Sequence, residues 1–299
     1  MPPAGSNTIA IASPVSGATI TRNRVILKGA LDPNLKGMQI VVETSRPGET
    51  APDSSYLAHI NGVYFAAVVP LVDGTNIIKV KGTDQNGVER SATVTINASP
   101  GPDAVLLTYT TPNAGLPEAN PDGSTSLDVT LQAINYTWDQ VTYSWDFNGD
   151  GAGDLQCSTT SVTTGRYTSP GIYLPMVTMT GSLGRQYKDT TIVNVMNPDD
   201  MDGMFKMIWN SMKNALSNQD IARAMTHIAD SSKESFAAQF DAVGGALAAA
   251  VAGMGNVNRV QMGTGFAEYE FRTQVNGNTY SFQVMFGQDT DGMWRISSF

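Results

Sequence analysis

Residues 143–154 read YSWDFNGDGAGD, and their side chains could bind a metal ion. Carboxylate and amide side chains recur along this stretch, and the glycines between them let the backbone turn tightly. Calcium loops alternate Asp or Asn with other residues and add a backbone carbonyl, because Ca²⁺ takes about six to eight oxygen ligands. The sequence therefore predicts a calcium site. Its ligands would be Asp146, Asn148, Asp150, the carbonyl of Ala152, and Asp154.

Two features limit what this loop could do. Cys157 stands where an EF-hand has its bidentate glutamate, and no helical pattern flanks the loop. A calcium sensor is therefore excluded, and a weak structural site with a dissociation constant of ~10⁻⁴–10⁻³ M remains. In the alternative interpretation, the same side chains bond their own backbone and form an acidic turn without metal. No other cofactor is predicted, and the shorter stretches DQNG (84–87) and DTDG (289–292) are predicted to be hairpin turns.

The last hundred residues contain titratable groups that could act as acids or bases. Three of them alternate along one expected strand with Tyr269 and Phe271, so they should face away from the aromatic side. His227 is expected to be structural, near the end of a short helix whose dipole favours a cation. We place no acid–base pair and predict no catalytic residues. The candidates considered are His227, Asp230, Glu268, Glu270 and Arg272.

Other catalytic signatures are missing from the sequence. No Gly-x-Ser-x-Gly, phosphate loop or HExxH occurs, and Cys157 has no histidine near it in sequence. Several aromatic residues could line a small-molecule pocket, but helical and strand periodicity predict that they belong to the core. These residues are Trp209, Tyr269, Phe282 and Trp294.

Composition excludes several classes of partner. The 299 residues carry a net charge of −9, so no basic patch is available to neutralise the phosphates of nucleic acid or an anionic membrane surface. The single cysteine excludes an intrachain disulfide and a cysteine metal cluster. No apolar run of ~18 residues is present, and we therefore expect no membrane insertion.

Residues 7–97 read as about seven short strands separated by the hairpin dipeptides NG, DG and NG, which predicts a β-sandwich. The stretch VPLVDGTNIIKVKGTDQNGVERSATVTI resembles the bacterial Ig-like domains of secreted proteins. Its acidic-Gly turn, its alternating Ile and Val, and its Asp-x-x-Gly carry the resemblance. The resemblance implies a fold and no particular ligand.

A Pro/Gly stretch, NASPGPDA (97–104), is predicted to link this sandwich to a second one at residues 103–197. Here a Trp-Asp-Phe strand enters a Gly/Asp turn, and a Tyr-x-x-Pro-Gly-x-Tyr turn follows at residues 167–173. Both parts resemble the polycystic-kidney-disease (PKD) type of Ig-like domain. Two sandwiches joined in this way are expected to make a semi-rigid rod.

The hydrophobic period changes after residue 198. A helix is predicted with one apolar face, followed by a short helix, by a third helix that Ser231 and Glu234 would cap, and by three strands. In the third helix the predicted apolar face includes Val243. This order resembles the cone-shaped fold of nuclear transport factor 2 and ketosteroid isomerase. The apolar face of the first helix would hold Met201, Phe205, Ile208, Trp209, Met212 and Leu216.

The predicted architecture is multidomain: two all-β Ig-like sandwiches (7–97 and 103–197) followed by an α+β cone (199–299), with three helices packed on a curved antiparallel sheet. We expect a non-enzymatic, secreted or cell-surface bacterial protein whose sandwiches present a C-terminal domain that binds a protein or ligand. The module types imply an extracellular, cell-surface or periplasmic location, with a signal peptide absent from this sequence. A homodimer through the C-terminal domain stays open.

Two alternatives also stay open. The C-terminal domain could be a small-molecule enzyme of isomerase, dehydratase or hydrolase type. The sandwiches could instead bind carbohydrate, which requires a row of exposed aromatic side chains on one face. The candidates for that row are Tyr56, Tyr64, Trp138 and Tyr143.

Overall fold

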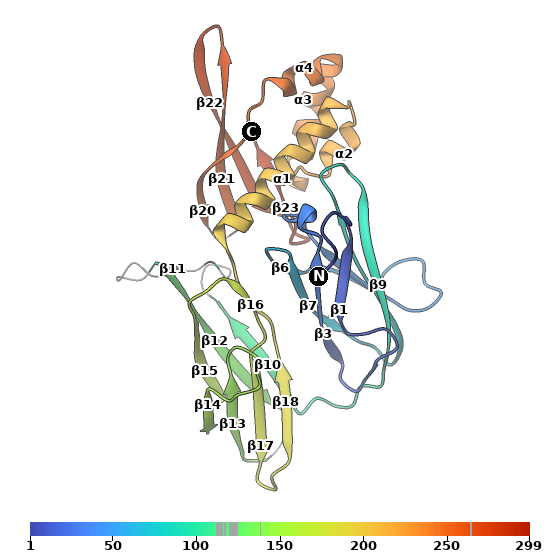
Figure 1. Ribbon diagram of the computed structural model, residues 1–299, viewed down its shortest axis with the longest axis vertical. Helices are drawn as coiled ribbons and strands as arrows, with labels where there is room; N and C mark the ends of the chain where they lie inside the picture. The colour runs from blue at the N-terminus through green and yellow to red at the C-terminus, as the bar shows by residue number, and fades with distance from the viewer. Residues whose placement is uncertain (112–115, 117, 120–124, 138, 264) are drawn as a thin grey trace. The chain divides into compact units, whose positions relative to one another are not determined.

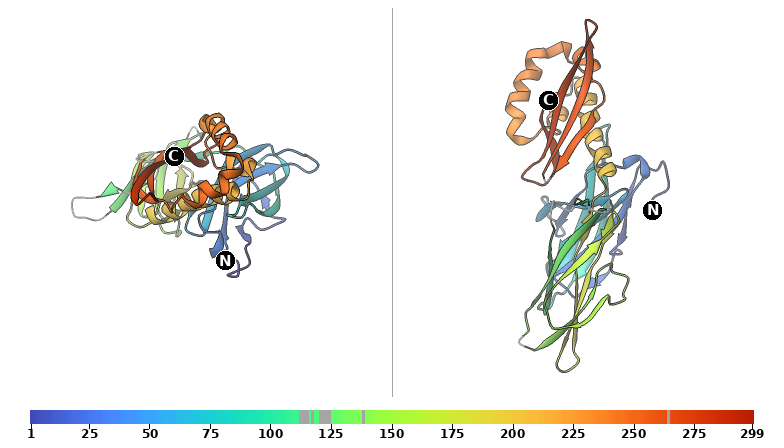
Figure 2. Two further views of the ribbon diagram at one scale, coloured as in Figure 1. Left: turned by 90° about the horizontal axis from the view of Figure 1, so that it is seen from above. Right: turned by 90° about the vertical axis from the view of Figure 1, so that its left-hand side faces the viewer.

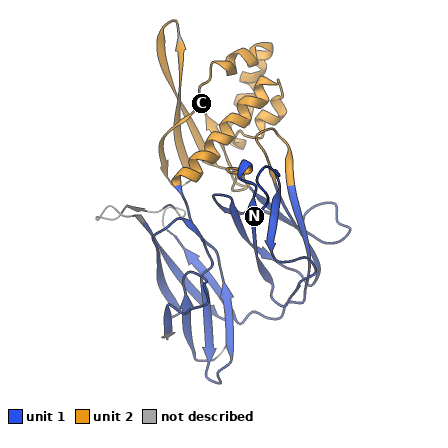
Figure 3. Ribbon diagram, in the orientation of Figure 1, with its two compact units in different colours: residues 1–34, 40–81, 91–197 blue, residues 35–39, 82–90, 198–299 orange. Residues whose placement is uncertain are grey.

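The chain is mostly β, with its helices near the C-terminus (Figure 1). The computed structural model describes every residue except 112–115, 117, 120–124, 138 and 264. It forms two compact units, shown in Figure 3. Unit 1 holds residues 1–34, 40–81 and 91–197, and unit 2 holds residues 35–39, 82–90 and 198–299. The predicted division into three domains stays a prediction, but the loops 35–39 and 82–90 belong to the same unit as the C-terminal residues.

The first part of the chain is an Ig-like β-sandwich of two sheets, ordered β1-β3-β7-β6 and β2-β9-β8-β4-β5. Alternating side chains fill the space between them, among them Leu27, Phe65 and Ile78, each fully buried. The glycines of the three predicted hairpin dipeptides have positive φ, and two of the dipeptides close hairpins: NG at 61–62 joins β6 to β7, and NG at 86–87 joins β8 to β9. The DG at 73–74 instead connects β7 to β8, which belong to different sheets, so its prediction as a hairpin turn was wrong. The strands are β1 (Ile9–Ser13), β2 (Thr19–Ile20), β3 (Arg24–Leu31), β4 (Val41–Ser45), β5 (Ser54–Leu57), β6 (His59–Asn61), β7 (Tyr64–Pro70), β8 (Gly74–Thr83) and β9 (Glu89–Ala98), with a 3₁₀ turn at Pro33–Leu35.

A second sandwich follows, in which β10, β12 and β15 pair in one sheet and β14-β13-β17-β18 form the other. Trp145 lies at its centre and is fully buried, packed among residues such as Leu127 and Val177. The strands are β10 (Val105–Thr110), β11 (Glu118–Ala119), β12 (Thr125–Asn135), β13 (Val141–Asp146), β14 (Leu155–Ser158), β15 (Val162–Tyr167), β16 (Gly171–Tyr173), β17 (Met176–Gly181), β18 (Gln186–Thr190) and β19 (Val193–Val195).

In unit 2, helices cover one face of the antiparallel sheet β20-β21-β22-β23 (Figure 2, right). All six residues predicted for the apolar face of the first helix are buried. Phe205 lies at the centre of this layer, within 5.5 Å of the rings of Tyr269, Phe286 and Trp294. The elements are α1 (Pro198–Ser217), α2 (Ile221–Met225), α3 (Lys233–Val243), α4 (Leu247–Ala252), β20 (Asn258–Gly263), β21 (Phe266–Val275), β22 (Asn278–Gln288) and β23 (Trp294–Ser298), with 3₁₀ turns at Asp230–Ser232 and Gly244–Ala246.

The helical part differs from its prediction in two ways. The third helix breaks into α3 and α4 at Gly244, whose φ of +54° only glycine adopts readily. The break turns Val243 out of the predicted apolar face, and its side chain is exposed. The predicted capping box is also wrong: the N-cap of α3 is Ser232, whose hydroxyl donates to the carbonyl of Ser297 instead of capping the helix.

The sheet has a fourth strand that the sequence pattern did not indicate. Strand β20 pairs with β21, but a bulge at Val260 interrupts the pairing and most of its side chains are exposed. By length and composition alone, the helical segment Asp230–Ala252 is the one segment among the described residues that could cross a membrane, contrary to the sequence expectation. Core helices of soluble proteins pass the same test, and Gly244 interrupts the segment.

Candidate functional site

The loop between β13 and β14 closes on the side chain of Asp146. This carboxylate is 4% exposed, and its two oxygens accept hydrogen bonds from the backbone N–H groups of Gly149 (2.7 Å) and Gly151 (2.8 Å). The Asp154 carboxylate accepts from the N–H of Phe147 at 2.7 Å. The predicted ligands thus lie in one loop and bond its own backbone, which is the geometry of the acidic-turn interpretation.

The exposed part of the same loop is held by side chains two residues apart. The Asn148 carbonyl oxygen accepts from the N–H of Asp150, and the Asp150 carboxylate accepts from the N–H of Ala152. This second hydrogen bond, together with one from the Asn148 amide, lowers the pKa of Asp150. The carboxylate therefore stays ionised at neutral pH. Among the described residues, no group of three or more His, Cys, Asp or Glu side chains is arranged to hold a metal ion.

Calcium binding stays a prediction, and calcium removal tests it. A site of the predicted affinity would add about 0.4–1.4 kcal/mol at millimolar calcium, and hence raise the unfolding midpoint of unit 1 by roughly 1–6 °C. We expect this shift between buffers with calcium and with EDTA, measured by calorimetry. Asp150→Ala should abolish the shift. A midpoint that EDTA leaves unchanged, both in the wild type and in Asp150→Ala, would leave the loop as an acidic turn.

The predicted acid–base candidates lie in two separate places. His227 and Asp230 lie next to β23, whereas Glu268 and Glu270 lie on β21. Burial, with Arg223 and Arg295 nearby, lowers the pKa of His227 to about 4. The imidazole is therefore neutral at neutral pH and does not act as a cation at the end of α2. The carboxylate of Asp230 pairs with Lys233 at 2.5 Å.

On the face of the sheet away from the helices, polar side chains bond one another across strands. Glu268 accepts from Gln261 and Gln283, each at 2.6 Å. Glu270 accepts from the hydroxyl of Ser281 and pairs with Arg272 at 2.7 Å. The predicted alternation is therefore confirmed, since these charges lie opposite the buried side chains of the same strand.

The structure contains one acid–phenol pair that the sequence analysis did not predict. The hydroxyl of Tyr269, a fully buried residue, donates to the carboxylate of Asp202 at 3.0 Å, and the same carboxylate pairs with Lys206 at 2.7 Å. Burial and the Asp202 charge raise the pKa of Tyr269, so the phenol stays protonated. A tyrosine whose strand position predicts burial needs a hydrogen-bond partner for its hydroxyl, and this requirement could have indicated the pair from the sequence. The Asp202 side chain is 21% exposed, so water reaches it.

A shallow polar pocket of about 270 Å³ lies beside this pair. Its wall contains a single apolar residue, Val257, whereas an isomerase-type site encloses its carboxylate in an apolar cavity. This pocket therefore gives the enzyme alternative no support. The lining residues are Lys206, Asn210, Asn256, Val257 and Asn258.

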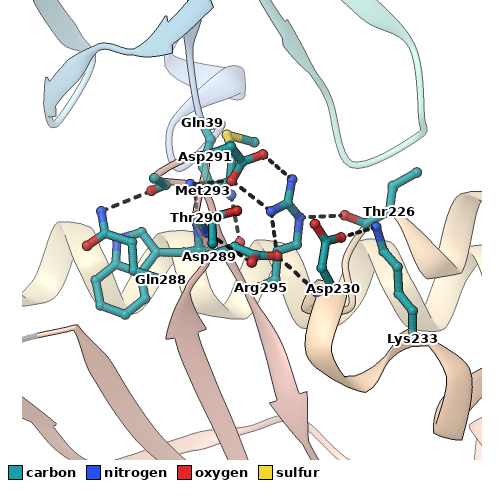
Figure 4. Close-up of polar contacts among 12 residues, drawn as sticks. Gln39, Thr226, Asp230, Lys233, Gln288, Asp289, Thr290, Asp291, Met293 and Arg295 are labelled. Carbon is teal, nitrogen blue, oxygen red and sulfur yellow. Dashed lines mark hydrogen bonds and ion pairs between the residues drawn. The ribbon is translucent and has the colours of Figure 1, made fainter.

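The turn DTDG joins β22 to β23 and is the centre of a polar cluster (Figure 4). Arg295 pairs with Asp289 at 2.9 Å and with Asp291 at 2.6 Å. The backbone N–H of Asp230, together with Arg295, holds the pKa of Asp289 below the usual range, and Arg295 does the same for Asp291. Asp289 also accepts a hydrogen bond from the N–H of Asp230. The predicted hairpin turn is thus confirmed, and its carboxylates are engaged in stabilising it.

The free edge of β23 is closed by side chains and by a neighbouring segment. The Gln39 amide bonds both backbone groups of Trp294, at 2.7 and 2.9 Å, as a neighbouring strand would (Figure 4). Farther along, Ile228 forms a parallel bridge with Ile296. A sheet edge that is covered in this way cannot pair with another chain.

Exposed aromatic side chains gather at the far end of β22. Tyr280 is 47% exposed and Phe282 is 43% exposed, although both share a face with the buried Val284 and Phe286. Phe282 stacks on Phe271, with ring centroids 5.1 Å apart. The hairpin formed by β21 and β22 extends past the helices at this end (Figure 1), so the face that is core elsewhere is uncovered here.

Most of the aromatic residues considered for a small-molecule pocket or for carbohydrate binding do not form a binding surface. Trp209, Tyr269 and Trp294 are buried in the core, as predicted, while Phe282 is exposed. Tyr143 is also buried, so its inclusion in an exposed aromatic row was wrong: it packs beside Trp145. Tyr64 is exposed and Tyr56 partly so. Trp138 lies outside the described residues, and so does the side chain of Cys157.

Comparison with known proteins gives no family assignment. No family model matches the chain, and no curated protein matches it. One solved structure that it resembles is described as "Structures of Clostridium thermocellum CbhA fibronectin(III)-like modules", with 13% sequence identity. The match covers 63% of this chain and 94% of that one, and its TM-score of 0.24 is too low to support an argument.

Proposed function

We propose that this chain is a non-enzymatic modular binding protein, in which the Ig-like sandwiches serve as spacers and the C-terminal domain binds a protein partner. Binding takes place on the aromatic face of the β21–β22 hairpin, defined by Tyr280 and Phe282. The observation that carries the proposal is their exposure on an otherwise apolar strand face. Large side chains exposed together cost solubility, and on soluble proteins they often mark interaction sites.

The aromatic face is continuous with the core of the domain. From Phe282 the ring contacts run to Phe271, then to Trp209 and then to Phe299, each step between 5.1 and 5.3 Å. A partner that covers Phe282 would therefore pack against a side chain already held in place by rigid neighbours. Preorganised aromatic residues of this kind lose little entropy on binding, which is why they recur as interface hot spots.

The finer assignments belong to the same proposal. The second sandwich is of PKD type, the C-terminal domain is a nuclear-transport-factor-2-like cone, and the protein acts outside the cell, at the cell surface or in the periplasm. The Trp145 strand, the tyrosine turn at 167–173 and the helices packed on one face of a sheet support the first two.

A surface variant tests the binding face. Tyr280→Ser/Phe282→Ser should weaken association by ~10-fold or more while the fold persists, because the side chains are half-exposed but would be buried in a complex. The measurement is sedimentation velocity of the protein alone, for a second copy, followed by co-purification from the producing cells, with the thermal midpoint as a check on folding. Leu183→Ser removes an exposed leucine from the β17–β18 turn and is the matched control. Equal behaviour of the two variants would contradict the proposal.

A further inference from the structure

Asp189 is a buried carboxylate that the proposed function does not use. It lies on β18 of the second sandwich, and 1% of its side chain is exposed. Four groups donate to it, and two of them are arginines of the first sandwich: Arg22, at 2.5 Å, and Arg24. The other two are the backbone N–H groups of Leu107, at 2.6 Å, and Thr190, at 2.7 Å. Residues far apart in sequence thus meet on a single carboxylate inside unit 1.

The charges at this position balance. Two arginines face Asp189, and a second carboxylate, Asp103, lies 3.6 Å from Arg24 and accepts a hydrogen bond from Asn23 at 2.5 Å. Two positive and two negative groups therefore form a neutral cluster, which we call the Asp189 cluster (Arg22, Arg24, Asp103 and Asp189). Buried charges persist when they are paired and bonded in this way, and removing one partner leaves the others uncompensated.

The segment that the sequence predicts as a linker is part of the same arrangement. The N–H groups of Ser99 and Gly101 donate to the carbonyls of Ile20 and Thr21, at 2.9 and 3.2 Å. Asp103 then enters the Asp189 cluster. The Pro/Gly stretch is therefore hydrogen-bonded along the first sandwich and does not run free between the sandwiches.

A second set of contacts joins the same two sandwiches. The Asn61 amide donates to the carbonyl of Val195 at 2.8 Å, and the Asn194 amide donates to the carbonyl of Ile60 at 3.1 Å. Asn194 is nearly buried, so its polar groups depend on these partners. The two sandwiches are thus joined at two separate places, the Asp189 cluster and the contacts of Asn61 and Asn194.

We infer that the Asp189 cluster couples the two sandwiches into one cooperative folding unit. The residues of unit 1 from position 7 onward then open and unfold together, and the spacer is stiffer than two sandwiches joined by a flexible Pro/Gly linker. The inference is independent of the proposed binding face. It implies that a substitution of Asp189 in the second sandwich also destabilises the strands of the first sandwich.

Hydrogen exchange on the full-length chain, resolved by segment, tests the coupling. Asp189→Asn should speed exchange by ~10-fold or more both in residues 105–110 and in residues 19–31, because the arginines of the first sandwich lose their buried partner. Arg24→Gln changes the first sandwich and should likewise speed exchange in residues 105–110 of the second sandwich. The matched control is Asp128→Asn, which removes an exposed ion pair with Arg166 inside the second sandwich and should leave residues 19–31 unchanged.

The outcomes separate coupling from a purely local role. If Asp189→Asn speeds exchange only in the second sandwich, the carboxylate stabilises its own sandwich alone and the inference is overturned. Should Asp189→Asn fail to fold, Arg24→Gln decides, since Arg24 retains some exposure and its replacement leaves no buried positive charge. No change in residues 105–110 for that variant would likewise overturn the coupling.

Discussion

Replacing Phe205 with alanine should destabilise unit 2 by about 3–5 kcal/mol, the range for removing a large aromatic side chain from a packed core. Phe205 is fully buried at the crossing of α1 with the sheet, in contact with three other aromatic rings. Alanine would leave a cavity among rigid rings that have little room to collapse. Phe205→Leu keeps more of the volume and should cost less.

Segment-resolved hydrogen exchange measures this effect, because the chain has two units and a single unfolding midpoint would mix them. The opening free energy of β21 and β22 should fall while that of residues 1–34 stays unchanged. Phe266→Ala is the control: the ring is 39% exposed at the start of β21, and its loss should cost about 1 kcal/mol or less. Equal losses for the two variants would mean that α1 and the sheet do not share one core.

Replacing Asp146 with alanine should destabilise the second sandwich by about 3 kcal/mol. The variant loses two short backbone hydrogen bonds to a buried carboxyl group, and hydrogen bonds to charged groups contribute about 1.5–3 kcal/mol each. The backbone N–H groups of Gly149 and Gly151 would lose this acceptor and would have to hydrogen-bond to water instead. Because 1 kcal/mol corresponds to ~2–4 °C in a cooperative unit of ~150–250 residues, the unfolding midpoint of unit 1 should fall by roughly 6–12 °C.

Calorimetry in EDTA measures this loss without any contribution from calcium. Asp150→Ala is the matched control, since its carboxylate is exposed and accepts a single backbone hydrogen bond, and its midpoint should fall by only a few degrees. If both variants lose the same amount in EDTA, Asp146 is not the residue that closes the loop.

Sequence periodicity predicts those parts of the fold in which one local rule determines which residues are buried or where the chain turns. The six apolar positions of α1 recur at helical spacing and are all buried, because a helix on a sheet can bury only one stripe. The glycines of both NG dipeptides likewise lie at hairpin turns, where a positive φ closes a tight hairpin, whereas the DG at 73–74 connects two sheets. Local chemistry also predicts that the loop residues 146–154 act together, though not whether calcium joins them.

Features that depend on distant residues could not be read in this way. Gln39 acts as a strand partner for Trp294, 255 positions away, and no local pattern indicates it. Strand β20 lacks an alternating pattern because its bulge and its exposure remove the need for apolar residues. The burial of Asp189 follows from Arg22 and Arg24, which belong to a different sandwich. The exposure of Phe282 follows from where the helices end.

Site-specific photo-crosslinking from position 282 tests the central claim, binding at the aromatic face, most directly. The full-length chain with benzoylphenylalanine at position 282 is irradiated alone and in the cells that produce it. A matched chain carries the probe at position 183, an apolar site in the second sandwich that is more exposed than Phe282. We predict a discrete crosslinked product from position 282 and none from position 183. The same products from both positions, or none from either, would contradict the claim.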